Sequence, residues 1–340
     1  MSEPEFYNYS PFAADLLPIL DREGAECRVA VIKATYALHS NGVPDIAEKP
    51  RPIRLGDEMW GDPAVADIRY PSDLCAYKPG TDFLVVGHAV APRGVAPDHV
   101  DVIIQFAGRT KFLRVYGERQ WERGVTGPRL GTPQPLTRVP LAWSRSYGGF
   151  DASDPAHPVE DPRNPVGRGV ARDVTTLLGK PAPQIESPES PIGLAGSRSQ
   201  PAGCAAIGRH YEPRRRYAGT YDAAWLHDRH PAAPLDYRDE FQQAAPPDQV
   251  FQTPLRGGEL IRIDGVSADA PVACRLPVLA IVVQAEVDGQ THTQRPHLDT
   301  ALVDTDAKVL ELTWRASFRC PAKMRNRFTV VRTNAKMEWP

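Results

Sequence analysis

The sequence predicts a mainly β protein of antiparallel sheets, arranged as a sandwich or barrel, with a long ordered region rich in proline and glycine and a few short helices. Proline accounts for 35 of the 340 residues, twice its usual share of about 5%. Because proline interrupts helices, this disfavours a helix-rich fold. Several runs rich in β-branched residues alternate apolar and polar side chains, as strands do. A hydrophobic fraction of 41% is sufficient to fill a core.

The N-terminal region, residues 1–125, is predicted to be β structure. Strands are expected at Cys27–Leu38 and at Thr81–Val90, which are both rich in β-branched side chains. The stretch His99–Trp121 is expected to form two strands around a turn at Gly108, which supplies the positive φ of a tight hairpin. Their spacing and type favour an antiparallel sandwich or barrel.

The middle region, residues 126–250, is dominated by proline, glycine, aspartate and arginine. Two short helices are expected, one near Val174–Leu178 and one at Tyr221–His230, where Thr220 or Asp222 would cap the N-terminus. The region contains many aromatic residues, whereas disordered segments are poor in them. We therefore expect an ordered wrap over the β scaffold rather than a linker.

The C-terminal region, residues 251–340, returns to strands. Gly257–Val266 alternates, and the apolar run after it leads to Asp288-Gly289, a strong hairpin signal. Two further strands are expected around Asp304–Lys308. The three regions are expected to form one compact unit or two tightly packed β lobes.

Composition narrows the possible classes of protein. A formal charge of −2 disfavours a nucleic-acid or anionic-membrane surface. The five cysteines are widely spaced without a CxxC pair, which argues against a disulfide scaffold or zinc knuckle and fits a reducing compartment. The start, "MSEPEFYNYSPF", lacks the features of a secretory signal, and no apolar stretch approaches the ~20 residues of a membrane helix. We expect a soluble, cytoplasmic protein.

The stretch "RNPVGRGVA" (Arg163–Ala171) raises the possibility of phosphate binding. It lacks the third glycine of a dinucleotide fingerprint and the pattern of a phosphate loop, and prolines precede it where a strand is required. The competing interpretation is a rigid turn, in which Asn164 before a proline is extended and the glycines adopt positive φ. Arg168 would then donate to a buried carboxylate or to backbone carbonyls.

Two histidine clusters suggest chemistry only weakly. His292, His297 and Asp299 would need a further ligand to bind a metal, and their spacing matches no common metal pattern. His210 and Glu212 are a conceivable base and acid, although a basic loop docked on acidic residues is the more ordinary interpretation. We expect no metal and no cofactor.

The candidate nucleophile and the candidate pair of acids each have an ordinary structural interpretation as well. Cys204 precedes His210 by six residues, but a buried structural cysteine is the commoner case. Carboxylates gather on one loop, as paired acids do in glycosidases, although acids among prolines and glycines are usually solvated turn residues. These carboxylates are Asp151, Asp154, Glu160 and Asp161.

The phrase "PLAWSRSYGGFD" combines aromatic residues with an arginine. Trp143 and Tyr147 are spaced i, i+4 around Arg145, and two glycines follow. Aromatic and arginine residues are enriched in binding hot spots, but they also pack loops onto sheets. The two interpretations are equally supported by the sequence.

Seven phrases occur in a fixed order between Val31 and Gln249: "VIKATYAL", "SDLCAYKPGTDFLVVGHAVAP", "KFLRVYGERQW", "PLAWSRSYGGFD", "NPVGRG", "PAGCAAIGRHYEPRRRYAGTYDAAW" and "FQQAAPPDQ". In this order they resemble a family of adaptors or chaperones encoded beside VgrG, PAAR and pentapeptide-repeat genes in type VI secretion loci, long catalogued as a domain of unknown function. The resemblance implies no catalytic residues. It also favours the rigid-turn interpretation of "RNPVGRGVA".

This resemblance implies a non-enzymatic protein that binds a secreted effector, or its PAAR-like region, in the cytoplasm and assists its loading on the VgrG spike. The partner-binding surface is then expected at aromatic and arginine residues of the middle region, namely Trp143, Arg145, Tyr147, Arg168, Tyr217 and Trp225. Two alternatives stay open at this point. One is a hydrolase of carbohydrate or peptidoglycan that uses the loop carboxylates, and the other is a structural component of the spike.

Overall fold

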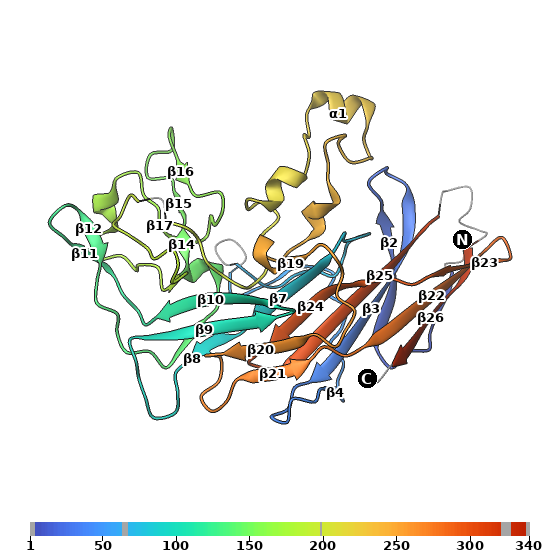
Figure 1. Ribbon diagram of the computed structural model, residues 1–340. Helices are drawn as coiled ribbons and strands as arrows, with labels where there is room; N and C mark the ends of the chain where they lie inside the picture. Colours follow the sequence, from blue (N-terminus) through green and yellow to red (C-terminus); the bar gives the residue numbers. More distant parts are fainter. Residues whose placement is uncertain (1–3, 63–66, 198, 321–327, 338–340) are drawn as a thin grey trace.

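The computed structural model describes residues 4–62, 67–197, 199–320 and 328–337. Its framework is a seven-stranded sheet whose strands come from both ends of the chain (Figure 1). Across this sheet the order is β19 (Val250–Phe251), β7 (Thr81–Val86), β24 (Leu298–Asp304), β25 (Val309–Arg319), β3 (Glu26–Ala37) and β2 (Ala13–Leu20), with β4 (Asp45–Ile46) paired to the end of β3.

Two further sheets complete the scaffold. The five-stranded sheet has the order β18 (Ile185–Glu186), β10 (Arg109–Tyr116), β9 (His99–Phe106), β20 (Leu260–Asp264) and β21 (Val272–Arg275). The four-stranded sheet has the order β1 (Glu5–Asn8), β26 (Phe328–Met337), β22 (Leu279–Val287) and β23 (Gln290–Gln294). The expectation of a mainly β fold is therefore confirmed.

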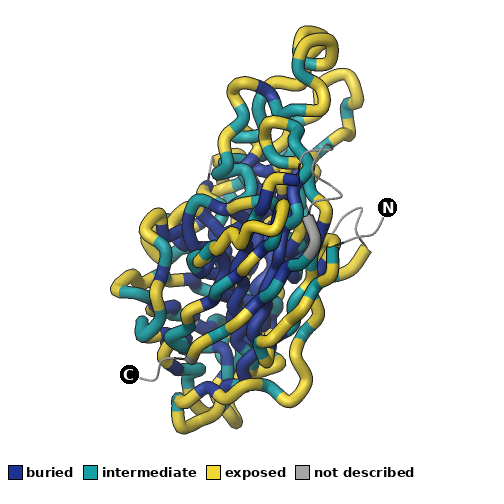
Figure 2. Tube along the Cα trace, turned by 90° about the vertical axis from the view of Figure 1, so that its right-hand side faces the viewer, coloured by how far each residue is buried: buried dark blue, intermediate teal, exposed yellow. Residues whose placement is uncertain are grey.

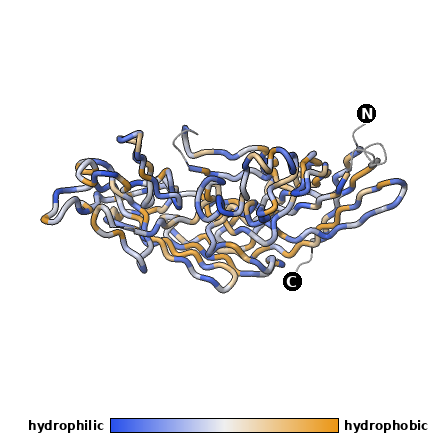
Figure 3. Tube along the Cα trace, turned by 90° about the horizontal axis from the view of Figure 1, so that it is seen from above, coloured by the Kyte–Doolittle hydropathy of each residue, from blue (hydrophilic) through white to orange (hydrophobic). Residues whose placement is uncertain are grey.

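One apolar core joins the three sheets. Alternate residues of β3, including Ile32 and Ala34, share this core with Ile104 of β9 and Val283 of β22. Phe83 of β7 and Phe106 of β9 stack with ring centroids 3.6 Å apart. Figure 2 shows the buried residues concentrated in these sheet layers, and Figure 3 shows that the molecule is longer than it is deep. The sheets therefore pack as a sandwich, each strand turning its apolar side chains inward.

The pairing of β7 with β24 is parallel, although most other pairs are antiparallel. Both strands are buried along their whole length, as parallel strands usually are. The chain between them, residues 87–297, contains the whole five-stranded sheet and the proline-rich middle region. The middle region is thus carried as an insertion between two neighbouring strands of the framework.

The remaining elements are short. Two-stranded ribbons pair β5 (Glu58–Met59) with β6 (Ile68–Tyr70), β8 (His88–Val90) with β13 (Arg138–Pro140), β11 (Trp121–Arg123) with β12 (Pro128–Leu130), β14 (Tyr147–Gly148) with β17 (Arg168–Gly169), and β15 (Phe150–Asp151) with β16 (Val159–Glu160). The helices are α1 (Ala223–Asp228) and the 3₁₀ turns η1 (Trp143–Arg145), η2 (Val174–Leu177), η3 (Arg214–Tyr217), η4 (Asp239–Gln242) and η5 (Pro247–Gln249). No helix in the described residues has the length and apolar character needed to span a membrane.

Both hairpin turns expected from the sequence are present. Ala107 and Gly108 have φ of 46° and 79°, and Asp288 and Gly289 have φ of 54° and 72°. Two consecutive positive φ values are the signature of a type I′ turn, which matches the twist of the flanking strands. The helix expected near Val174 is a 3₁₀ turn, and the second expected helix is a shorter α1 capped by Asp222.

The face of the seven-stranded sheet that points away from the apolar core is also buried, although it carries charges. It is covered by residues 47–62 and 67–80, which supply Arg51, Arg54 and Tyr70. The buried charged side chains on the sheet itself are Lys33, Asp82, Asp299, Asp304, Glu311 and Arg315. Alternation along these strands therefore places the main apolar core on one face. The other face carries these charges together with smaller apolar clusters that include Val31, Leu84 and Leu302.

Glu311 lies at the centre of the ionic layer. The two terminal nitrogens of Arg54 lie 2.6 and 2.8 Å from its two carboxylate oxygens, and a terminal nitrogen of Arg51 lies 3.1 Å away. The ammonium of Lys33 lies 3.6 Å from Glu311 and also binds Asp73. Burial lowers the pKa of Lys33, and the attraction of the two carboxylates opposes that shift.

Replacing Glu311 by alanine is expected to lower the free energy of unfolding by about 3–5 kcal/mol, because it leaves buried arginine and lysine charges uncompensated. Urea unfolding followed by circular dichroism measures this. The matched control is Asp269→Ala, which removes the acid from an exposed pair with Arg93 and is expected to leave stability close to that of the wild type. Equal effects of the two substitutions would contradict the importance of the ionic layer.

Candidate partner-binding surface

The stretch Arg163–Ala171 forms a rigid turn packed on the "YGGF" segment. The side-chain amide of Asn164 is fully buried and donates to the carbonyl oxygens of Trp143 and Tyr147, each at 2.8 Å. A Cβ on Gly148 would lie 2.2 Å from the Asn164 carbonyl oxygen, so the two backbones touch. The glycines permit this close contact between chain segments. The geometry matches the rigid-turn interpretation.

Trp143 and Tyr147 contribute mainly to packing. Trp143 is buried with Ala205 and Tyr211, and its indole nitrogen donates to the Ala205 carbonyl oxygen at 3.0 Å. Tyr147 is buried in a separate cluster with Trp121. This second cluster is the interior of a side lobe formed by residues 117–197, which lies at the left of Figure 1. Both aromatic residues thus order the middle region from within.

Arg145 and Arg168 lie close enough to interact electrostatically. Arg145 donates to Gln184 at 2.7 Å and to Glu118 at 3.3 Å. Burial and then repulsion by Arg145 lower the pKa of Arg168, and its guanidinium donates no hydrogen bond to any residue in the described part of the chain. The carboxylate or carbonyl partner expected for Arg168 is therefore not found there. Of the predicted residues, these two and Tyr147 form one local group.

Tyr217 and Trp225 lie elsewhere, on a projecting segment that we call the α1 arm (residues 208–245), at the top of Figure 1. The Asp222 side chain accepts from the backbone nitrogen of Trp225 at 2.8 Å and so caps α1. Tyr217 packs its ring under Arg238, whose guanidinium carbon lies 5.0 Å from the ring centroid. Aromatic contacts and caps thus shape the arm, because a six-residue helix is too short to be stable alone.

The far side of the arm is fixed to the hairpin between β2 and β3. The backbone nitrogen of Ala233 donates to the Arg22 carbonyl oxygen at 2.8 Å, and Arg229 lies 3.4 Å from Glu23. Gly24, with φ of 72°, lets the hairpin approach so closely that a Cβ there would lie 2.8 Å from the Ala232 nitrogen. The arm is therefore held against the scaffold at its root and along one flank.

The α1 arm exposes large apolar side chains that the sequence analysis did not single out. Leu226 is 63% exposed and Leu235 is 81% exposed, and Tyr221 beside Trp225 is more than half exposed. We call Tyr221, Trp225, Leu226 and Leu235 the arm patch. The sequence signal was weak, since each leucine stands alone among polar residues and prolines. Figure 2 shows that exposed residues dominate this projection.

Glu212, His210 and Cys204, the candidates for acid–base or nucleophilic chemistry, make structural contacts with neighbouring residues rather than with one another. Glu212 binds Arg216 at 3.0 Å, and its backbone nitrogen donates to Pro162 of the acidic loop. Burial lowers the pKa of His210, whose ring packs on that of Tyr211. Burial raises the pKa of Cys204 to about 12, and its thiol contacts the Val85 carbonyl oxygen at 3.7 Å.

The loop carboxylates are engaged in local structure. Asp161 is buried and binds Arg163 through both oxygens. Asp151 accepts from the backbone nitrogens of Arg172 and Ser153, which lower its pKa. A glycosidase acid needs a raised pKa instead. Asp154 binds His157 at 3.1 Å, and Glu160 is exposed in β16. These contacts are those of turn residues.

The side chains of His292, His297 and Asp299 do not come together to form one site. His297 lies 3.0 Å from the Lys78 carbonyl oxygen, Asp299 binds Arg315, and His292 is exposed on β23. Within the described ranges, no group of three metal-binding side chains is found.

Replacing Gly24 by alanine is expected to loosen the arm, because the new Cβ would meet the Ala232 backbone. Trypsin cleavage at Arg229 should become about tenfold faster, which corresponds to a loss of about 1.4 kcal/mol in local stability. The control is Gly108→Ala, at another positive-φ turn where the Cβ meets open space. Unchanged cleavage at Arg229 in the Gly24 variant would show that this contact does not hold the arm.

Alkylation tests the protonation of the buried thiols. Burial raises the pKa of Cys204 and of Cys274 to about 12, so at pH 8 only about 10⁻⁴ of each is thiolate. Iodoacetamide should label both about 10³-fold more slowly in the native protein than in urea, as read by peptide mass spectrometry. Rapid native labelling of Cys204 would instead support the nucleophile hypothesis.

Comparison with known proteins identifies the family. Residues 23–315 match the family described as "Uncharacterized protein conserved in bacteria (DUF2169)". No curated protein and no solved structure matches the chain. The match spans β3 to β25 and includes the side lobe and the α1 arm. The chain therefore belongs to this bacterial family, DUF2169.

Proposed function

We propose that this protein is a non-enzymatic adaptor or chaperone, which binds a type VI secretion effector or its PAAR-like region in the cytoplasm and assists its loading on the VgrG spike. The secretion role rests on the resemblance of its ordered phrases to such adaptors. The observation that carries partner binding is the arm patch. Exposed apolar groups gathered on a projection are typical of protein-binding sites.

The chemistry of the arm patch fits a protein client. Trp225 and Tyr221 form an edge-to-face pair with ring centroids 4.7 Å apart, and the Trp225 indole donates to the Ala232 carbonyl oxygen at 2.8 Å. The aromatic side chains are thus held in place before binding, which reduces the entropy lost when a partner docks. The exposed leucines add apolar area on the same arm. The arm is therefore a preorganised anchor for a client.

The scaffold is suited to presenting this anchor. The arm is fixed at the β2–β3 hairpin, and the hairpin strands pair along their length within the seven-stranded sheet. A client bound to the arm is thus held on a rigid body, as a loading step on a spike requires. Arg145 and Arg168 of the side lobe would add charge contacts to an acidic part of the client.

Co-purification tests the proposal. The tagged protein is expressed with the effector and PAAR-type products of its neighbouring genes, and a single client is expected to elute in stoichiometric amount. Replacing both Leu226 and Leu235 by aspartate should lower client recovery at least about tenfold, as expected for the loss of hot-spot contacts. The matched control, Val125→Asp, changes a fully exposed apolar residue of the side lobe and should retain the client.

Two results would contradict the proposal. If the protein purifies without any partner although the neighbouring genes are well expressed, the claim that it binds a client from those genes is wrong. If the double aspartate variant recovers as much client as the control variant, the arm patch is not the client-binding site. A secretion assay separates the adaptor from a spike component, because the adaptor is expected to stay in the donor cell while a spike component would appear in the secreted fraction.

A further inference from the structure

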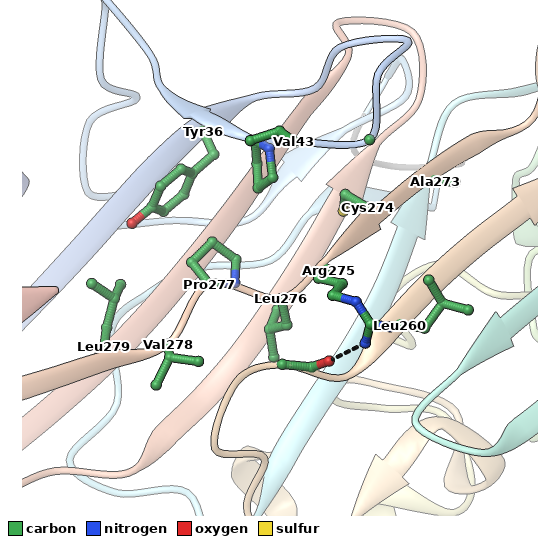
Figure 4. A pocket seen from close by; sticks show the side chains of 13 residues that line it. Tyr36, Val43, Leu260, Ala273, Cys274, Arg275, Leu276, Pro277, Val278 and Leu279 are labelled. Atoms are coloured by element: carbon green, nitrogen blue, oxygen red, sulfur yellow. Dashed lines mark hydrogen bonds between the residues drawn. The ribbon is translucent and has the colours of Figure 1, made fainter. Parts of the chain in front are cut away.

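An apolar groove of about 490 Å³ opens between the connection from β3 to β4 and strand β21. Its lining includes Val43 and Pro44 of that connection, Cys274 of β21, and Leu276 and Leu279, which follow β21 in the chain. Figure 4 shows Val43 at one side of the groove and Cys274 and Leu276 at another. In Figure 1, β4 and β21 lie near the lower edge of the molecule, whereas α1 lies at the top. Both the volume and the apolar lining are typical of ligand sites. The groove is separate from the arm patch.

Strand β21 presents an unpaired edge to this groove. It is the last strand of the five-stranded sheet and pairs on one side with β20. Leu276 exchanges backbone hydrogen bonds with Gly258 and Glu259, so by alternation the backbone of Cys274 also faces β20. The backbones of Ala273 and Arg275 face away from β20, and they bond to no backbone group in the described part of the chain.

The free edge is short and bounded. Pro271 directly precedes β21, and Pro277 follows its last residue by two positions. Because proline has no N–H and resists strand pairing, each limits how far an added strand extends. Between them lie five residues, and the outward backbone groups of Ala273 and Arg275 bond to no backbone group in the described part of the chain. The loop before β4 flanks this edge, since a Cβ on Gly42 would lie 3.5 Å from the Ala273 carbonyl oxygen. The edge therefore accepts a segment of this length rather than a long strand.

Tyr36, one of the residues that line the groove, has a buried hydroxyl without a hydrogen-bond partner among the described residues. The residue is only 3% exposed. Burial raises its pKa to about 12, so the group is a neutral donor at physiological pH. Figure 4 shows its ring on the wall opposite Cys274. A buried hydroxyl left unpaired is costly, and an occupant with an acceptor relieves that cost.

The rim of the groove carries one positive charge. Arg275 is exposed, donates to the Gly258 carbonyl oxygen at 2.9 Å, and forms no ion pair within the described residues (dashed in Figure 4). On an added strand, the residue directly opposite Arg275 would point to the same side. The residue next to it would point the other way, toward the apolar wall around Cys274.

We propose that this groove binds an extended peptide segment of a partner protein, which adds as a strand to β21. The segment places apolar side chains in the groove, an acidic side chain opposite Arg275, and a carbonyl oxygen at the Tyr36 hydroxyl. This is β-strand addition, in which main-chain bonds give affinity and alternate side chains give specificity. An acyl chain would fill the groove and reach Arg275, but it would leave the Ala273 and Arg275 backbone groups unpaired.

The probe is a library of random heptapeptides displayed on phage and selected on the full-length protein. Enriched peptides are expected to alternate apolar residues and to carry Asp or Glu. The best peptide, made synthetically, should protect the amides of residues 272–276 from hydrogen exchange. Its affinity should fall at least about tenfold with Ala273→Pro, which removes an outward N–H at an edge position where proline is tolerated. Ala273→Val is the matched control and should change the affinity less than about threefold.

Tyr36→Phe supplies a second, independent variant. It should weaken the same peptide severalfold because the hydroxyl donor is lost, while the melting temperature of the free protein stays the same or rises because an unpaired buried group is removed. Folding of each variant is checked by its melting curve. A loss of peptide affinity in a variant that melts like the wild type therefore reports on binding.

Three outcomes would overturn the proposal. The first is that the selection enriches no peptide, or only peptides that bind Ala273→Pro as tightly as the wild type. The second is binding of oleate that Ala273→Pro leaves intact, which would assign the groove to an acyl chain. The third is a concentration-dependent dimer that Ala273→Pro abolishes in analytical ultracentrifugation, which would assign the edge to a second copy of the chain. None of these bears on the arm patch, so the two proposals are tested separately.

Discussion

The buried ionic layer on one face of the seven-stranded sheet is the constraint on which the rest of the fold depends. Glu311 is surrounded by Arg51, Arg54 and Lys33, and the two arginines come from a segment with little regular structure. Charges are stable in such a place only when every member is paired. Residues 47–62 and 67–80 must therefore lie where they do, and the sheet is covered on both faces.

This double coverage explains how the scaffold carries its projections. With β7 and β24 as parallel neighbours buried on both faces, the chain between them has to leave the sheet and return. The side lobe and the α1 arm form in that excursion. The side lobe has its own small cluster around Trp121 and Tyr147, and a second cluster joins Trp143 of the lobe to Ala205 and to Tyr211 of the arm. Binding surfaces on such projections can vary without disturbing the framework, which is the usual division between scaffold and loops.

Sequence patterns were informative where local chemistry is decisive. The turns at Gly108 and Asp288-Gly289 were predicted because they depend on φ preferences of single residues. The cap of α1 by Asp222 is equally local. The expected partner-binding residues do not share one exposed surface, since Trp143 and Tyr147 are buried, whereas Leu226, which was not among them, is exposed. An aromatic residue in a loop has the same local signature in either position, and only its neighbours in space distinguish them.

The sequence by itself determined the mainly β class, the main hairpins and the fact that the irregular middle region is ordered. The signals for these features are periodicity, glycine positions and aromatic content, and each can be seen within a short stretch of the chain. The tertiary structure alone decided the parallel pairing of β7 with β24, the ionic layer around Glu311, and the groove at β21. Each of these brings together residues far apart in the chain, as Arg54 and Glu311 are. Such contacts depend on how sheets pack and which edges stay unpaired, and no local pattern encodes that.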